Sequence, residues 1–168
     1  KSEKVASSAV IASICNVNAA QVRKDFAYFG EFGIRGMGYN VKDLKRHIKE
    51  ILGINREWRI AVVGVGNMGS ALLVYKDFLK QNYKIVAAFD LYPEQVIGRI
   101  SERVGKPVEI LNINRLKDVV QARNIEIGII TTPPHEAQKV ADLLIEANIK
   151  GILNFSPAPV RTSGDVKL

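Results

Sequence analysis

The chain has 168 residues, of which 47% are hydrophobic and 24% are charged, and its formal net charge is +7. This composition is typical of a folded globular protein and excludes a disordered chain. There is no apolar run near the roughly 18 residues of a membrane span, no signal-peptide core after Lys1 and only one cysteine, so we expect a cytoplasmic protein without disulfides.

The first predicted element is a helix from Val5 to Asn16. Ser7 or Ser8 can cap it, because a serine side chain accepts a hydrogen bond from an amide of the first turn. The apolar positions on one face of this helix are Val10, Ile11, Ile14 and Cys15. Cys15 is therefore expected to be a buried core residue and not a nucleophile.

A second helix is predicted to begin after Asn18 and to end before Gly30. Asn18 can cap this helix while Gln21 reaches back to it, which is the pattern of a capping box. The face expected to point inward holds Val22, Phe26 and Phe29. The opposite face holds Ala20, Arg23, Lys24 and Ala27. Small residues beside two cations form a face that can enter a groove of DNA.

Glycines alternate with apolar residues from Gly30 to Tyr39, which predicts a tight hairpin with Arg35 near its tip. Two helices followed by such a wing favour a winged helix-turn-helix, with the second helix in the major groove and Arg35 in the minor groove. The alternative is a plain helical hairpin. Up to Arg56 the chain carries ten Lys and Arg against five Asp and Glu, a net charge of +5, whereas the remainder carries +2. This asymmetry favours a segment that binds a polyanion, and a solvated basic surface is the alternative.

A third helix is predicted from Val41 to about Leu52, ended by Gly53. Its cations, expected to face solvent or phosphate, are Lys42, Lys45, Arg46 and Lys49. We expect His47 on this helix to lie at the surface, since no second ligand or acid stands at metal or relay spacing. The segment from Gly53 to Trp58 is the expected domain boundary.

An apolar strand then runs directly into a glycine-rich turn, Gly64-Val65-Gly66-Asn67-Met68-Gly69, and a helical pattern follows. The order of strand, G-x-G-x-x-G and helix predicts a dinucleotide-binding turn whose free amides face a pyrophosphate. Gly64 permits the tight turn, Gly66 lets the backbone approach the phosphates, and Gly69 lets the helix lie close to the strand.

A second buried strand, from Lys84 to Asp90, ends in an acid about 20 residues beyond the last glycine of the turn. At this spacing a carboxylate accepts hydrogen bonds from the adenosine ribose hydroxyls. No arginine directly follows Asp90 that could bind the 2′-phosphate of NADP. Asp90 therefore favours NAD over NADP. The alternative role for Asp90 is to cap the helix that begins near Glu94.

Strands and helices continue to alternate, which predicts an α/β fold. The expected elements are a helix from Glu94 to Arg103, a strand from Val108 to Leu111, a helix from about Asn114 to Ala122, a strand beginning at Ile125, a helix from His135 to Ala147 and a strand from Gly151 to Phe155. We expect a winged helix-turn-helix in residues 1–56 and a Rossmann-like dinucleotide-binding domain in residues 57–168. Ligands bind outside the carboxyl ends of such strands, so Thr131, Thr132 and Pro133 are expected on the nicotinamide side.

A dehydrogenase would need an acid or base beside the nicotinamide. His135 is the available histidine, and its place after two prolines favours a residue of the first helical turn. There is no Ser-x-x-x-Tyr-Lys arrangement or metal-ligand cluster, and about 110 residues leave little room for a substrate domain. We therefore expect binding without turnover and no metal.

Several blocks carry a more specific signal because they occur together in one order. They are Val22 to Gly30, Gly36 to Val41, Gly64 to Gly69, Phe89-Asp90 and Lys150 to Ala158. In these blocks the chain resembles the Rex-type redox-sensing transcriptional repressors of bacteria. The resemblance implies a homodimer that holds a palindromic operator in double-stranded DNA and senses the ratio of NADH to NAD, with NADH releasing the DNA.

The resemblance also implies roles for individual residues. The implied DNA-binding residues are Ala20, Arg23, Lys24, Arg35, Gly36, Gly38 and Tyr39. The implied residues for NAD(H) are Gly64, Val65, Gly66, Asn67, Met68, Gly69 and Asp90, with Thr131, Thr132, Pro133, Asn154 and Phe155 near the nicotinamide.

The sequence departs from the family pattern in three places. The family usually has a C-terminal helix that swaps onto the partner subunit, and a sequence ending at Leu168 does not contain it. The helix before the reading pair looks shortened at Lys1, and the segment from Glu109 to Asn112 lacks the tyrosine expected there. Two alternatives remain, a small NAD-dependent oxidoreductase and a module that binds coenzyme A.

Overall fold

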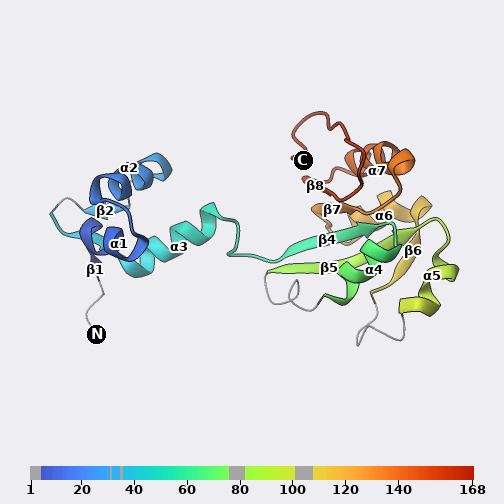
Figure 1. The fold of residues 1–168 in the computed structure, drawn as a ribbon, viewed down its shortest axis with the longest axis horizontal. Helices are drawn as coiled ribbons and strands as arrows, with labels where there is room; N and C mark the ends of the chain where they lie inside the picture. Colours follow the sequence, from blue (N-terminus) through green and yellow to red (C-terminus); the bar gives the residue numbers. More distant parts are fainter. Residues whose placement is uncertain (1–4, 31, 35, 76–81, 101–107) are drawn as a thin grey trace. The chain divides into compact units, whose positions relative to one another are not determined.

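The structure is a computed structural model that describes residues 5–30, 32–34, 36–75, 82–100 and 108–168 (Figure 1). The chain divides into two compact units, Lys1–Arg56 and Glu57–Leu168. None of the helices in the described ranges is long and apolar enough to cross a membrane.

The N-terminal unit combines helices with a small antiparallel sheet. Its elements are β1 (Val5–Ala6), α1 (Ser8–Cys15), α2 (Ala19–Phe29), β2 (Gly33–Ile34), β3 (Gly38–Asn40) and α3 (Val41–Ile51). The strand order is β1-β3-β2, and β2 pairs with β3 as a hairpin directly after α2. Two tightly joined helices followed by a hairpin are consistent with the predicted winged helix. Arg35, the predicted tip of the wing, lies outside the described residues.

Side-chain caps explain where the helices of this unit begin. Ser7 caps α1 and Asn40 caps α3, each accepting hydrogen bonds from amides of the first turn. At α2 the Asn18 Oδ1 accepts from the Gln21 amide at 2.7 Å, as predicted. The Gln21 side chain does not reach back, however, because its Nε2 donates to Asp25 Oδ1 one turn further on. The cap therefore forms without the second half of the capping box.

The core of the N-terminal unit is small. Its buried side chains are Ala12, Val22, Tyr39 and Leu44. Phe26 packs edge-on against Tyr39 with ring centroids 5.0 Å apart. Two expectations of burial are wrong, since Cys15 is exposed and Phe29 is 52% exposed. The apolar stripes on α1 and α2 are wider than the faces these two helices bury against each other and the sheet, so the residues at the stripe edges stay outside.

His47 is half-buried, contrary to the surface position expected for it. Its ring packs against Phe32 with centroids 4.9 Å apart, and its Nε2 lies 2.9 Å from Arg46 Nη2. The wing residue Phe32 covers this part of α3. This contact joins segments that are distant in the sequence, so the local sequence pattern does not show it.

The second unit is built around a parallel sheet. Its elements are β4 (Trp58–Val63), α4 (Asn67–Val74), β5 (Tyr83–Asp90), α5 (Pro93–Ile100), β6 (Ile110–Asn112), the 3-10 helix η2 (Ile113–Arg115), α6 (Leu116–Ala122), β7 (Ile127–Ile130), α7 (Pro134–Glu146) and β8 (Gly151–Asn154). The order β6-β5-β4-β7-β8 confirms the predicted Rossmann-like fold. The predicted end of α5 at Arg103 lies outside the described residues.

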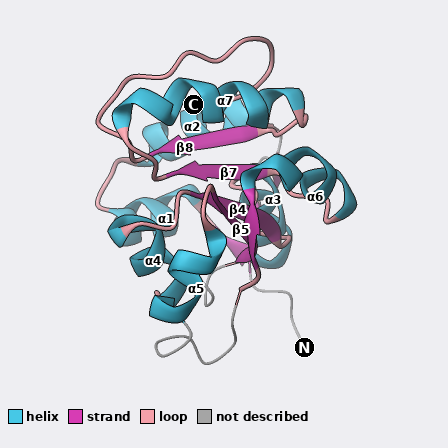
Figure 2. Ribbon diagram, turned by 90° about the vertical axis from the view of Figure 1, so that its right-hand side faces the viewer, coloured by secondary structure: helices cyan, strands magenta, loops and turns pink. Residues whose placement is uncertain are grey.

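Helices cover both faces of this sheet (Figure 2), with α4 and α5 on one face and α6 and α7 on the other. The central strand β4 buries alternate side chains on the two faces, so Ile60 and Val62 join the core under α4 while Val63 joins the core under α7. A strand buried on both faces reads as a continuous apolar run, which is how β4 reads in the sequence. This packing fixes the end of β4, where the glycine-rich turn begins.

Candidate functional site

Two glycines of the turn after β4 are required by close backbone contacts. Gly64 adopts a φ of +94°, and a Cβ there would lie 2.8 Å from Thr132 Cγ2. At Gly69 a Cβ would lie 2.0 Å from the Gly64 carbonyl oxygen, so α4 can approach β4 only without a side chain at this position. Both roles were predicted from the sequence.

Gly66 stands in a different environment. A Cβ built at this residue would meet no atom of the described chain within 4 Å. Gly66 is the N-cap residue of α4, and the first three amides of any helix, here those of Asn67, Met68 and Gly69, have no intrahelical acceptor. Open space in front of free amides at the positive end of a helix suits a phosphate group.

The Asp90 carboxylate joins the ends of two strands. Its Oδ2 accepts from the Val65 amide at 2.8 Å, and its Oδ1 accepts from the Tyr92 amide at 3.0 Å. Each carboxylate oxygen can accept a further hydrogen bond, because an ionised carboxylate has about four acceptor sites. Asp90 thus holds the glycine-rich turn in place and still has acceptor sites for ligand hydroxyl groups.

Thr131 and Thr132 follow β7 and differ in their contacts. Thr131 Oγ1 lies 2.6 Å from the Gly64 carbonyl oxygen and 3.0 Å from that of Val63, so the hydroxyl group ties the glycine-rich turn to β7. Thr132 Oγ1 is buried and has no hydrogen-bond partner within the described part of the chain. An orphaned hydroxyl at a cavity wall fits a bound ligand with polar groups, since burying it unpaired costs free energy.

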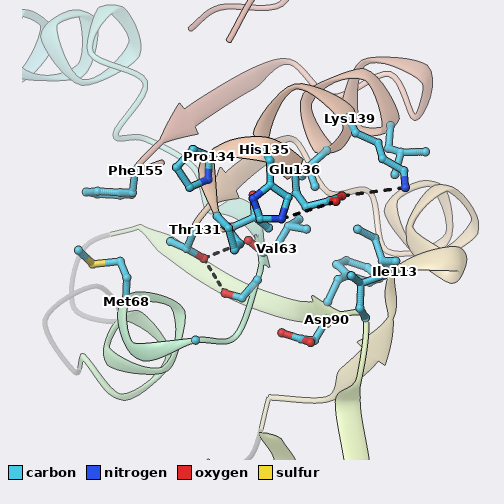
Figure 3. Close-up of a pocket in the computed structure, with 18 of the residues that line it drawn as sticks. Val63, Met68, Asp90, Ile113, Thr131, Pro134, His135, Glu136, Lys139 and Phe155 are labelled. Carbon is cyan, nitrogen blue, oxygen red and sulfur yellow. Dashed lines mark hydrogen bonds and ion pairs between the residues drawn. The ribbon is translucent and has the colours of Figure 1, made fainter. Parts of the chain in front are cut away.

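These residues surround a cavity of about 730 Å³ (Figure 3). The cavity lies at the carboxyl ends of β4 and β7, where the strand order reverses and ligands of such sheets bind. Its volume falls within the range of about 300 to 1,000 Å³ that is typical of small-molecule sites. The predicted residues that line it are Gly64, Gly66, Met68, Asp90, Thr131, Thr132, Pro133 and Phe155.

Four predicted residues do not line the cavity. Val65 is 2% exposed and packs in the core, and Gly69 is buried under the turn. Asn67 is exposed at the start of α4. The Asn154 side chain shapes the loop after β8, where its Nδ2 donates to the Ala158 carbonyl oxygen at 2.8 Å.

One side of the cavity is formed by the first turns of α7, which the sequence did not predict. His135, Glu136 and Lys139 line the cavity, and Figure 3 shows their side chains together on the first turns of α7. Glu136 lies 4.0 Å from both His135 Nε2 and Lys139 Nζ, which is the distance of weak, solvated ion pairs. The position of α7 after β7 could have indicated this wall, but helical spacing alone does not show which face meets a ligand. His135 is 75% exposed, and the described residues hold no group of three metal-ligating side chains.

Gly66→Ala is expected to weaken NADH binding without changing the fold. The backbone of Gly66 has a φ of −73°, which alanine adopts freely, and no neighbour opposes a Cβ. The methyl group would occupy the space in front of the α4 amides. Losing one hydrogen bond to a charged phosphate costs about 1.5 to 3 kcal/mol, or roughly 10- to 150-fold in affinity. Fluorescence titration with NADH measures the loss, and an unchanged affinity would show that the phosphates lie elsewhere.

In the N-terminal unit the predicted DNA-binding residues divide into two groups. Ala20, Arg23 and Lys24 are exposed on α2. Gly36 has a φ of +81° with open space around it. Tyr39, in contrast, is 8% exposed and belongs to the core. A second cavity, of about 670 Å³, lies between α1, α2 and the wing.

Comparisons with known proteins bear on both units. A family model described as CoA binding domain matches residues 55–158. The chain is 50% identical to the redox-sensing transcriptional repressor Rex of Syntrophobacter fumaroxidans, over 94% of this chain and 73% of that protein. It is 48% identical to the protein of the same name from Solidesulfovibrio magneticus, over 97% of this chain and 72% of that protein.

Solved structures of a Rex-family repressor, RSP, are also similar to this chain. The structure matches the crystal structure of RSP in complex with β-NAD+ and operator DNA with a TM-score of 0.81 and 33% identity, covering 98% of this chain and 74% of that one. The crystal structure of RSP in complex with β-NADH matches with a TM-score of 0.71 and 31% identity, over 98% of this chain and 74% of that one. A third structure, of RSP described as a Rex-family repressor, has a TM-score of 0.74.

Proposed function

The chain belongs to the Rex family of redox-sensing transcriptional repressors, and we propose that it represses transcription by binding operator DNA and releases this DNA when it binds NADH. The observation that carries the proposal is the 50% identity to a Rex repressor over 94% of the chain. A match of this length includes the second helix of the basic pair and the glycine-rich turn alike. We propose residues 1–56 as the DNA-binding domain and residues 57–168 as the nucleotide-binding domain.

NAD(H) is the cofactor, and the contacts of the second unit support a pose for it. The amides at the start of α4 would hold the pyrophosphate, with open space before Gly66. Asp90 would accept hydrogen bonds from the adenosine ribose and would repel a 2′-phosphate. Thr132 and Phe155 would lie on the nicotinamide side. When bound, the nicotinamide carries the redox state, because its ring is cationic in NAD and neutral in NADH.

The DNA partner is double-stranded operator DNA. In our proposal Arg23 and Lys24 on α2 enter the major groove, while Arg35 and the glycines of the wing reach the minor groove. A homodimer would place two reading helices on a palindrome with half-sites about one helical turn, or a multiple of it, apart. A repressor that acts on DNA in a bacterium is proposed to work in the cytoplasm.

Redox sensing requires a difference in affinity. A ligand shifts an equilibrium between two arrangements only as far as it binds one better than the other, so NADH must bind the DNA-incompetent arrangement more tightly. Typical couplings are about 1 to 3 kcal/mol, or roughly 5- to 150-fold. The oxidoreductase alternative is not favoured, because the curated relatives are repressors.

DNA binding is tested by selection. The whole protein is mixed with a library of duplexes that carry a randomised palindrome, and the bound fraction is sequenced. We expect one palindromic sequence to emerge, bound at least about 10³-fold more tightly than random duplex at physiological salt. A protein that enriches no sequence would not be a repressor of the proposed kind.

Arg23→Ala is expected to weaken binding to the selected operator by about 1 to 3 kcal/mol and to relax specificity at one position, if Arg23 reads a base. Arg161→Ala removes an exposed arginine from the other unit and serves as the matched control for charge. Fluorescence anisotropy with the operator and with single-base variants measures both effects. Equal losses in the two variants would mean that Arg23 contributes charge alone.

A further inference from the structure

A hydrogen bond connects the two helices of the predicted DNA-binding pair. Arg23 Nη1 on α2 donates to Ser8 Oγ on α1 at 3.1 Å. Ser8 is half-buried at the first position of α1, and Arg23 is exposed. This hydrogen bond places the Arg23 guanidinium group against α1.

Both partners of this bond line the cavity of about 670 Å³ that the wing completes. Gly33, Gly36 and Gly38 of the wing line the same cavity. A helix in the major groove and a wing in the neighbouring minor groove straddle one strand of phosphates, so this concave surface faces the DNA backbone. The bond thus lies where DNA would be received.

We propose that Ser8 is a positioning residue that fixes the Arg23 guanidinium for base recognition and thereby sets the specificity of the repressor. The proposal rests on the proposed function. Ser8 accepts one of the five guanidinium N–H groups and leaves the others free in their planar fork, the geometry that pairs with a guanine edge.

Fixing an arginine side chain before it binds raises its affinity for the partner, because a free arginine side chain has many rotamers to lose. Immobilising such a side chain at an interface costs affinity, and a side chain that is already fixed avoids this cost. The typical cost corresponds to roughly 2- to 13-fold in binding. Lys24, the next residue on α2, has no hydrogen bond or ion pair to other described residues and would act as an unpositioned charge.

Neighbouring serines on α1 provide matched controls. Ser7 Oγ accepts from the Val10 amide at 3.2 Å and caps the helix, so Ser7→Ala removes a structural bond. Ser13 is exposed on the same helix and does not line the cavity. Ser7 also lines the cavity, so Ser7→Ala serves to show the loss of thermal stability that follows from losing a helix cap. Ser13→Ala should change neither thermal stability nor base discrimination.

The test is a double-mutant cycle on the whole protein, with the operator selected as described above and a duplex changed at the base pair that Arg23 reads. Ser8→Ala should weaken operator binding roughly 2- to 13-fold and narrow discrimination between the duplexes, while Ser8→Thr restores both. In an Arg23→Ala background Ser8→Ala should have no further effect.

The proposal would be overturned if Ser8→Ala lowered operator affinity equally in both backgrounds, or if discrimination between the duplexes were unchanged. Ser8 would then contact DNA independently of Arg23 or have no role in recognition. Failure of the unmodified protein to select any operator would instead overturn the proposed function, so the two failures are distinguishable.

Discussion

Replacing Gly69 with alanine is expected to abolish measurable NADH binding and to lower the free energy of unfolding of the second unit by about 1 to 3 kcal/mol. A Cβ at this position would lie 2.0 Å from the Gly64 carbonyl oxygen, and that oxygen belongs to the backbone of the turn. If the nearest atom belonged to a flexible side chain, that side chain could rotate away. Because the nearest atom is a backbone oxygen, the turn or α4 must move. Either movement displaces the amides that face the phosphates.

The two consequences of Gly69→Ala are measured separately. Trp58, the single tryptophan, begins β4, so its fluorescence during urea unfolding reports on the second unit. Titration with NADH reports on the site. Gly66→Ala is the matched control, because it should weaken binding at wild-type stability. A Gly69→Ala protein that binds NADH with normal affinity would contradict the assigned packing of α4 on the turn.

Asp90→Ala is expected to weaken NADH binding by more than the loss of ribose contacts alone. A hydrogen bond to a charged group contributes about 1.5 to 3 kcal/mol, or roughly 10- to 150-fold in affinity. In addition, the Val65 amide loses its acceptor, since Asp90 Oδ2 accepts from it at 2.8 Å. The turn itself should therefore loosen. Removing the carboxylate also removes its repulsion of a 2′-phosphate, so the preference for NADH over NADPH should narrow.

Asp90→Asn separates the two effects, because it keeps an acceptor for one backbone amide but loses the charge. We expect its NADH affinity to lie between those of the wild type and Asp90→Ala. Isothermal titration calorimetry with NADH, NADPH and coenzyme A measures the affinity of each variant for the three ligands. Unchanged NADH affinity in Asp90→Ala would show that the Asp90 carboxylate does not bind the adenosine ribose.

Features that depend on local sequence were predictable. The strand, glycine-rich turn and helix at Gly64 to Gly69 form as expected, because Gly64 takes a positive φ at the turn and Gly69 meets the Gly64 carbonyl oxygen within the same turn. Asp90 ends β5 as its spacing indicated. Its bond from the Val65 amide was not foreseen, because this bond depends on how the two strands pair.

Features that depend on which surfaces meet were not predictable. Cys15 lies in an apolar stripe, yet it is exposed because α1 buries only part of that stripe. Phe29 is exposed for the same reason. Glu136 and Lys139 line the cavity although nothing in their spacing distinguishes them from a solvated helix face. In each case the sequence indicates the helix, and packing decides its inward side.

The central claim is that nucleotide redox state controls DNA binding. A fluorescently labelled operator duplex is bound to the whole protein, and its anisotropy is followed while NADH or NAD is added at equal concentrations. We predict that NADH raises the apparent Kd for DNA by roughly 5- to 150-fold and that NAD raises it far less. Equal effects of the two nucleotides, or no effect of either, would contradict the account.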